Sequence, residues 1–229
     1  KSINITGIGG ASATGDRNSG IFVVTDSVIE ATNGMVTLDG TSGSGTTRNR
    51  GVDIESGSIV KGKSISIAGK KGDNTNTTAD FNQGIFIFDN SMIEATDALV
   101  TLTGTGGAGT DSNLGVNVEG STVKGKGVNI TGNGGIDATA ELNHGILIFD
   151  GSVINALDAT VTLMGTGGTG TNGNQGVNIQ TSMIMCKDIT VTGTGNTNTT
   201  GEFTHGIFLA DNSKINGAAT ITITGPSGG

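Results

Sequence analysis

The sequence contains no tryptophan, no tyrosine, one proline and one cysteine among its 229 residues. The single cysteine, Cys186, excludes an internal disulfide and a zinc site built from cysteines. Charged residues make up only 14% of the chain and the net charge is -8, a balance that disfavours nucleic acid as a partner. No apolar run reaches the roughly 18 residues of a membrane-spanning helix, so the sequence predicts no membrane insertion.

Glycine and short aliphatic runs dominate what is present. The chain has 42 glycines, and only 33% of its residues are hydrophobic. Most apolar residues are Ile, Val or Leu in alternation with Thr, Ser or Asn. Sparse apolar content with strict patterning is typical of a thin solenoid, whereas a disordered glycine-rich linker lacks the alternation.

A glycine followed by an alternating aliphatic run recurs along the whole chain. These glycines stand at positions 20, 51, 84, 115, 145, 176 and 206, so their successive differences are 31, 33, 31, 30, 31 and 30. Such regular self-similarity indicates stacked repeats of about 30 residues. Two types alternate, which we name A repeats (Gly20, Gly84, Gly145 and Gly206) and B repeats (Gly51, Gly115 and Gly176). The alternation indicates double repeats of about 61 residues.

Each repeat contains three short runs with a period of two, which predict three strands with one buried face. In the repeat of Gly84 these runs cover residues 85–88, 91–93 and 100–104. No segment has a helical period, which excludes β-α-β architectures. We therefore predict an all-β, right-handed parallel β-helix (solenoid) of about seven three-stranded coils, forming a single domain over residues 1–229. Because neither end shows a polar cap, we expect an internal segment of a longer chain or a filament subunit.

Three columns of equivalent residues support this stacking. An asparagine stands two residues before the repeat glycine, and asparagine tolerates left-handed corners and stacks through its amide; the column comprises Asn18, Asn49, Asn82, Asn113, Asn143 and Asn174. A serine column comprises Ser27, Ser58, Ser91, Ser121, Ser152, Ser182 and Ser213. Glu30, Lys61, Glu94 and Lys124 alternate in charge at one outward position, which predicts modest attraction between neighbouring strands.

All seven phenylalanines belong to A repeats, at or just before the first strand. If Ile85 and Ile87 point inward, the alternating residues point outward and form a stripe; the candidates for a partner surface are Phe22, Phe86, Phe88, Leu147, Phe149 and Phe208. B repeats place polar residues at the same positions, so aromatic bands recur every two coils, roughly 9.6 Å. Either the preceding loop folds back, with Phe81, Leu142 and Phe203 on the stripe, or the stripe is an exposed partner surface.

Repeated aspartates, two histidines and a row of threonines are the remaining candidates for chemistry. Asp89, Asp150 and Asp211 recur at one corner, but each is followed by Asn-Ser or Gly-Ser, which is a turn signature. His144 and His205 are two coils apart, too far to share a metal, so we expect exposed turn residues. Outward threonines on the third run resemble ice-binding arrays, although Asp39, Ala68 and Met164 interrupt them. We predict no catalytic site, no metal site and no cofactor.

Specific motifs resemble a known family. They are Gly-Val-Asn-Ile at residues 176–179, the Asn-x-Gly-Ile corner, and the run Val-Thr-Leu-x-Gly-Thr-Gly-Gly-x-Gly-Thr at residues 100–110 and 161–171. They are similar to the large secreted β-helix repeat proteins of the filamentous haemagglutinin type. The resemblance implies a right-handed β-helix, export to the cell surface or extracellular space, and an adhesin-type role with cell-surface or matrix ligands.

Two other functions remain open from the sequence. One is a subunit of an extracellular filament, in which copies stack end to end and bundle through the phenylalanine stripe. The other is a polysaccharide-degrading β-helix enzyme, which the repeated, non-singular position of the aspartates disfavours. The sequence leaves the first of these as the closer alternative.

Overall fold

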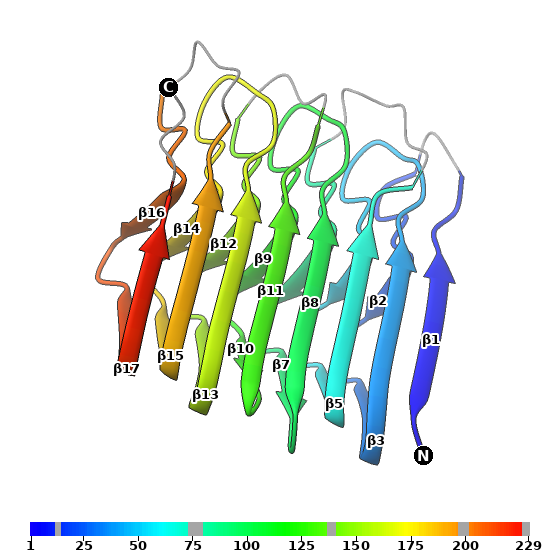
Figure 1. The fold of residues 1–229 in the computed structure, drawn as a ribbon. Coiled ribbons are helices and arrows are strands. Elements are labelled where there is room, and N and C mark those ends of the chain that lie inside the picture. The colour runs from blue at the N-terminus through cyan, green and yellow to red at the C-terminus, as the bar shows by residue number, and fades with distance from the viewer. Residues whose placement is uncertain (12–14, 73–79, 137–140, 197–201, 226–229) are drawn as a thin grey trace.

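The computed structural model describes residues 1–11, 15–72, 80–136, 141–196 and 202–225. All regular structure in these ranges is β-strand, arranged as two layers of parallel strands that the chain visits in turn (Figure 1). The chain runs up the front layer, over the top and down the rear layer while it advances from β1 to β17, which is a right-handed path. The predicted all-β parallel β-helix is confirmed.

The rear layer is a seven-stranded sheet with one strand per coil. Its members are β2 (Ile21–Val23), β4 (Val52–Ile54), β6 (Ile85–Phe88), β9 (Val116–Glu119), β12 (Ile146–Phe149), β14 (Val177–Gln180) and β16 (Ile207–Ala210). The front layer is a ten-stranded sheet. It holds β1 (Ile3–Ile8), β3 (Val28–Thr41), β5 (Ile59–Lys70), β7 (Met92–Ala95), β8 (Leu99–Thr105), β10 (Thr122–Lys124), β11 (Gly127–Asn133), β13 (Val153–Thr166), β15 (Met183–Thr194) and β17 (Lys214–Thr224).

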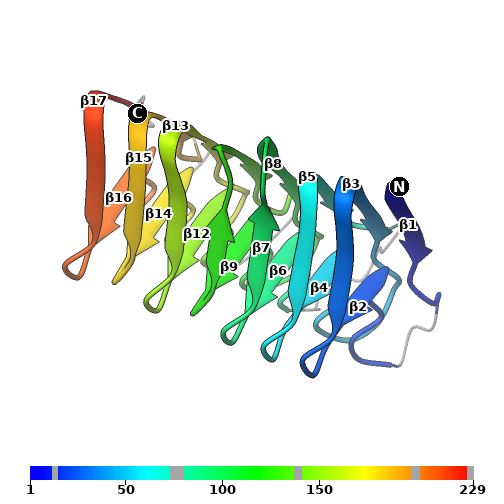
Figure 2. The same cartoon turned by 90° about the horizontal axis from the view of Figure 1, so that it is seen from below.

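The second and third predicted runs of a repeat do not always form separate strands. They are separate as β7 and β8, and again as β10 and β11, but β3, β5, β13, β15 and β17 each carry both runs in one bent strand. The bend shows as a register irregularity, for example between Ala156 and Thr160 in β13. Figure 2 shows the bent strands side by side along the solenoid. The bend lets one strand serve two sides of the coil.

The core consists of aliphatic side chains stacked in register. Ile130 pairs with Leu102 in the coil before it and with Leu163 in the coil after it, and all three are buried. Each fully buried side chain of this size contributes about 1.5–3 kcal/mol relative to its exposed state. Because every interior coil repeats the same inward positions, the hydrophobic core is a continuous column along the solenoid axis.

The asparagine column runs along one corner of this core. The backbone N–H of Asn82 donates to Oδ1 of Asn113 at 3.1 Å, that of Asn113 to Asn143 at 3.0 Å, and that of Asn143 to Asn174 at 3.0 Å. The same amides also bond to each other, as between Asn113 Nδ2 and Asn143 Oδ1 at 3.2 Å. Each buried side chain thus satisfies the backbone of the previous coil, as a continuous polar column requires.

The sequence predicts a left-handed conformation at these asparagines, but the structure has it one residue earlier. Positive φ values of 54–65° occur instead at the residue before each asparagine, namely Arg17, Arg48, Phe81, Ser112, Leu142 and Gly173, and also at Phe203 one coil further. The asparagine side chain has to point into the column to accept its hydrogen bonds. The chain therefore reverses one residue earlier, where the side chain can project away from the core.

The repeat glycines lie where the two sheets approach each other most closely. A Cβ on Gly115 would lie 2.4 Å from the backbone nitrogen of Asn133 and 2.5 Å from the carbonyl oxygen of Gly145. The matching glycine at the end of the front strand, Gly104, would place its Cβ 2.0 Å from the carbonyl oxygen of Gly115. Glycine recurs at these positions because the backbones pack so closely that there is no room for a Cβ atom.

The serine column closes the opposite corner. Ser58 Oγ donates to the carbonyl of Glu55 at 2.8 Å and Ser152 Oγ to that of Phe149 at 2.7 Å. The remaining members make the same kind of local bond to a carbonyl two or three residues earlier: Ser27, Ser91, Ser121, Ser182 and Ser213. These hydroxyls satisfy carbonyl groups at the turn, a frequent role of serine.

Two charge ladders run along the ten-stranded sheet. Glu94 lies 3.2 Å from the ammonium groups of both Lys61 and Lys124. Burial raises the pKa of Glu94, but the hydrogen bonds from the two lysines outweigh it and the net pKa is lowered. A second ladder, which the sequence reasoning missed, joins Asp97 to Lys63 at 3.2 Å and to Lys126 at 2.6 Å. Both are exposed ladders and contribute modestly.

Candidate functional site

The outward face of the seven-stranded sheet carries the candidate site. Its first outward row, which we call the floor row, alternates in register between apolar and polar side chains: Phe22, Asp53, Phe86, Asn117, Leu147, Asn178 and Phe208. A second row lies two residues further along each strand: Val24, Glu55, Phe88, Glu119, Phe149, Gln180 and Ala210. Strand spacing places equivalent A-repeat side chains about 9.6 Å apart.

A third set of side chains comes from the residue just before each repeat glycine, which we call the cover row: Ser19, Arg50, Gln83, Leu114, His144, Gln175 and His205. Several of these lie against the floor row. The guanidinium carbon of Arg50 is 3.9 Å from the ring centroid of Phe86, and Gln175 Oε1 accepts from Asn178 Nδ2 at 3.2 Å. The cover row therefore buries much of the floor row.

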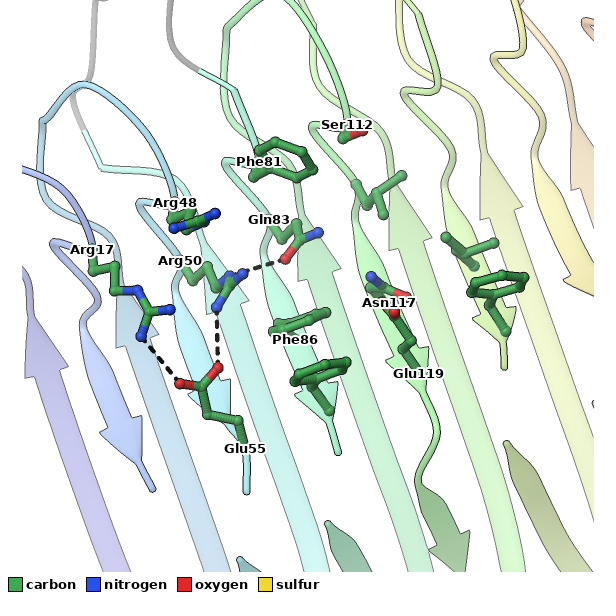
Figure 3. A pocket seen from close by; sticks show the side chains of 14 residues that line it. Arg17, Arg48, Arg50, Glu55, Phe81, Gln83, Phe86, Ser112, Asn117 and Glu119 are labelled. Atoms are coloured by element: carbon green, nitrogen blue, oxygen red, sulfur yellow. Dashed lines mark hydrogen bonds and ion pairs between the residues drawn. The ribbon is translucent and has the colours of Figure 1, made fainter. Parts of the chain in front are cut away.

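Two hollows open beside these rows. The first measures about 390 Å³ and the second about 360 Å³, and both are lined by Leu147 and Phe149. Figure 3 shows the first hollow, with Arg17, Arg48, Phe81 and Ser112 along one rim and the strands below them. Because Leu147 and Phe149 line both hollows, the hollows lie next to each other along the sheet, and we call the two together the sheet groove.

An ion cluster forms the floor at the N-terminal end of the sheet groove. Arg50 Nη1 lies 2.8 Å from Asp53 Oδ2 and 3.6 Å from Glu55 Oε2, while Arg50 Nε donates to Gln83 Oε1 at 3.0 Å. Arg17 reaches the other oxygen of Glu55 at 3.2 Å. Burial raises the pKa of Asp53 from 3.8 to about 6, although Arg50 lowers it in part. These contacts hold Arg50, a residue of the cover row, over the buried carboxylate of Asp53.

Three polar groups in the first hollow are not used by this cluster. Arg48 is exposed on the rim and forms no ion pair with any described residue. Asn117 is 3% exposed, and its Oδ1 has no hydrogen-bond partner in the described structure. Burial raises the pKa of Glu119, which accepts a hydrogen bond from the side chain of Asn117. The exposed cation Arg48 and the acceptor Glu119 therefore line the same hollow, and the Asn117 amide is buried beneath them.

The second hollow has a neutral polar floor. His144 Nδ1 accepts from the backbone N–H of Gln175 at 3.2 Å, and its Nε2 lies 3.3 Å from Nδ2 of Asn178. Gln180 Nε2 donates to Asn178 Oδ1 at 2.9 Å. Burial lowers the pKa of His144 from 6.5 to about 3, so the ring is neutral at ordinary pH. The prediction that His144 is an exposed turn residue is wrong, whereas His205 is exposed.

The phenylalanine stripe is only partly a surface. Phe86 is 6% exposed, so its assignment to an exposed partner surface is wrong; Arg50 lies over one side of its ring, and Phe88 stacks on it at a centroid distance of 5.3 Å. Phe22 is 47% exposed, while Phe88, Leu147, Phe149 and Phe208 are half-buried. Phe88, Leu147, Phe149 and Phe208 line the sheet groove, whereas Phe22 lines neither hollow.

The alternative, in which the preceding loop covers the stripe, is not what the structure shows: the residues expected to cover it lie at the rim of the groove. Phe81, Leu142 and Phe203 line the same hollows as the stripe but remain 42%, 48% and 60% exposed. They occupy the left-handed corner positions, which direct their side chains outward. The corner residues therefore border the sheet groove and leave it open.

No other candidate site emerges from the described ranges. Asp89, Asp150 and Asp211 have φ values of 53°, 55° and 54°, so they occupy left-handed turn positions. Within the described residues, His, Cys, Asp and Glu nowhere gather in a group of three that could hold a metal ion. In the same ranges no helix has the length and apolarity to cross a membrane.

Fold and groove together define a parallel β-helix repeat protein with two adjacent hollows on one sheet. Comparison with protein-family models, with curated proteins and with solved structures found no match. The architecture is therefore established by the structure, while the resemblance to the filamentous haemagglutinin type stays a prediction.

Proposed function

We propose that this chain is a non-catalytic segment of an extracellular, adhesin-type rod of the filamentous haemagglutinin kind. The observation that supports this most is the unbroken register of the seven-stranded sheet, in which each strand pairs with the next without an insertion. Each further coil of this kind lengthens a solenoid by about 4.8 Å without changing its width. Such a structure acts as a stiff spacer that holds a binding surface away from its anchor.

The chemistry of the columns that repeat from coil to coil supports a mechanical role over a catalytic one. The repeated aspartates serve turns, the asparagines satisfy backbone groups and the repeat glycines allow close packing. An active site requires a group of residues that differs from its repeats. The sheet groove varies from coil to coil, but its variation lies in rim and floor side chains suited to binding.

Immunogold electron microscopy on the cells that produce the protein tests this proposal. We expect label on the outer surface or in the surrounding matrix, at a fixed distance from the cell envelope. Label confined to the cytosol would contradict an extracellular rod. Reducing-sugar release from a panel of polysaccharides addresses catalysis separately, and steady release by the purified chain would replace the rod by an enzyme.

A filament subunit is the second candidate. Ile221 and Ile223 on β17 are 50% and 52% exposed, and Ile8 on β1 is 79% exposed. In the described structure β1 pairs only with β3, and β17 only with β15. These edges fit a further coil, from the same polypeptide or from another copy. Electron microscopy of the purified chain separates the two: ordered fibres favour the filament, and isolated short particles favour the segment of a longer rod.

A further inference from the structure

We infer that the sheet groove binds an extended acidic polysaccharide, with a sugar carboxylate at Arg48 and sugar rings over Phe88 and Phe149. The inference goes beyond the rod, because a rod could hold its anchor and its tip apart with an empty groove. It rests on four features of the groove: its repeat distance, its aromatic surfaces, its unused polar groups and its arginines.

The repeat distance fits a chain built from sugar pairs. Phe88 and Phe149 belong to successive A repeats, so they stand two coils, or about 9.6 Å, apart. Two β-linked hexose units in an extended glycan span this distance. Between the two rings lies Glu119, a hydrogen-bonding side chain on the intervening B repeat. The groove thus offers an apolar surface and a polar surface in the alternation that a disaccharide repeat presents.

The aromatic side chains offer platforms of fixed orientation. Phe88 stacks on the buried ring of Phe86, with 16° between the ring planes, and Arg50 holds Phe86 from the other side. Further along, His205 stacks on Phe208 at a centroid distance of 5.9 Å. A half-buried ring that is packed from behind loses little freedom on binding, which favours affinity. The C–H faces of sugar rings are suited to such surfaces.

The unused polar groups require a ligand with both donors and acceptors. The half-buried carboxylate of Glu119 lines the first hollow, is held by the side chain of Asn117 and keeps acceptor sites for a ligand. A ligand hydroxyl that donates to this carboxylate forms a charge-assisted hydrogen bond. Sulfate or a simple carboxylate brings no donor at neutral pH, whereas a sugar acid brings hydroxyl groups beside its carboxylate.

The arginines supply the charge preference. All three arginines of a chain with net charge -8, namely Arg17, Arg48 and Arg50, line the first hollow. Arg17 and Arg50 are paired with Glu55 and Asp53, so Arg48 is the guanidinium left for a ligand. Guanidinium binds carboxylate through two parallel hydrogen bonds. Among the described residues that line the second hollow there is no lysine or arginine, so the acidic sugar is placed at the N-terminal part of the groove.

Isothermal titration calorimetry of the whole chain with three hexamers tests the inference. The probes are β-1,4-linked mannuronate, its uncharged counterpart cellohexaose, and a glutamate peptide of equal charge. We expect mannuronate to bind, cellohexaose to bind about tenfold more weakly because one charge-assisted contact is lost, and the peptide not to bind. Failure of both glycans to bind, or equal binding of the peptide, would overturn the inference.

Two matched substitutions locate the binding. Arg48→Gln is expected to weaken mannuronate binding about tenfold and to leave cellohexaose unchanged. Lys187→Gln removes the same charge from an exposed position that lines neither hollow, and is expected to change nothing. Equal losses in the two variants would show diffuse attraction and overturn the assignment to Arg48.

The aromatic platforms are tested by Phe149→Ser, which is expected to weaken both glycans. Far-UV circular dichroism and the melting temperature of each variant verify the fold, and Phe88→Ser gives a second platform variant should Phe149→Ser unfold. Unchanged glycan binding in a folded platform variant would contradict a site in the sheet groove. None of these results bears on whether the protein is exported, so the rod proposal stands or falls by its own experiment.

Discussion

The guanidinium carbon of Arg50 lies 3.9 Å from the centroid of the Phe86 ring, and Nη1 of the same side chain lies 2.8 Å from Asp53 Oδ2. One side chain from the corner of a B repeat thus covers an aromatic ring of the next A repeat and balances a buried carboxylate of its own strand. The contact joins two coils through side chains as well as through backbone hydrogen bonds.

Loss of the arginine charge should therefore be costly. Arg50→Met keeps most of the side-chain volume but leaves Asp53 buried without its cation, and we expect a loss of about 3–5 kcal/mol in the free energy of unfolding. Urea denaturation measures it. Adding Asp53→Asn to the same chain should recover part of the loss, since the amide needs no counter-charge. Arg48→Met, at the exposed rim, is the control and should change stability by less than about 0.5 kcal/mol.

Stability should depend on pH through two groups with opposite signs. The pKa of Asp53 is raised from 3.8 to about 6, so the folded state holds a proton that the unfolded state releases, and stability falls by about 3 kcal/mol as pH rises from about 4 to about 6. The pKa of His144 is lowered from 6.5 to about 3, so the unfolded state holds the extra proton and stability rises with pH across that window.

The two contributions separate by substitution. Asp53→Asn should remove the fall of stability that Asp53 contributes, and His144→Gln should remove the rise that His144 contributes. Urea midpoints measured at several pH values between 3 and 7.5 give both slopes. An identical pH profile for the wild-type chain and both variants would mean that neither group titrates with a shifted pKa in the folded state.

The asparagine column should contribute more than any surface asparagine. Asn113→Ala removes the acceptor of the Asn82 backbone N–H and the donor to Asn143 Oδ1, both in buried surroundings. We expect a loss of about 1–3 kcal/mol. Asn133→Ala, on an exposed position of β11, should cost less than about 0.5 kcal/mol. Equal melting temperatures for the two variants would show that the column is dispensable.

The close approach at the repeat glycines gives a further stability test. Gly115→Ala would force its Cβ to within 2.4 Å of the Asn133 nitrogen, so backbone must move, at a cost of about 1–3 kcal/mol or more. Gly10→Ala is the matched control, because the nearest atom to its Cβ would be Asn18 Oδ1 at 3.8 Å. Thermal unfolding of the two variants compares them, and a stable Gly115→Ala protein would contradict the packing argument.

Periodicity was sufficient to predict the fold because a solenoid repeats one local solution. The regular spacing of the glycines gives the coil length, and the alternation of Ile85 and Ile87 with Phe86 and Phe88 gives the inward and outward faces of β6. Joining of the second and third runs into one bent strand was not predicted, because residues such as Thr160 carry the bend without a glycine or proline signal.

The site was predicted less well because its burial comes from side chains of another segment. Alternation correctly directed Phe86 outward from the core, but it did not show that Arg50 lies over it. His144 was predicted to be exposed for the same reason, because the sequence does not show which side chains of neighbouring coils bury it. A signal was present: polar or long side chains such as Arg50, Gln83 and Gln175 recur just before the repeat glycine. Because these residues differ in chemistry, the sequence did not show that they stack into one row, the cover row, in the structure.

The left-handed corners have a consequence for how such a protein can change. At these positions the side chain leaves the backbone away from the asparagine column, so Arg48, Phe81, Ser112 and Leu142 differ completely while the corner geometry stays the same. Substituting these residues changes the binding surface at the rim of the groove and leaves the asparagine column and the aliphatic core unchanged. Substitutions at the corners, whether in evolution or in design, can therefore change ligand preference in one coil independently of the others.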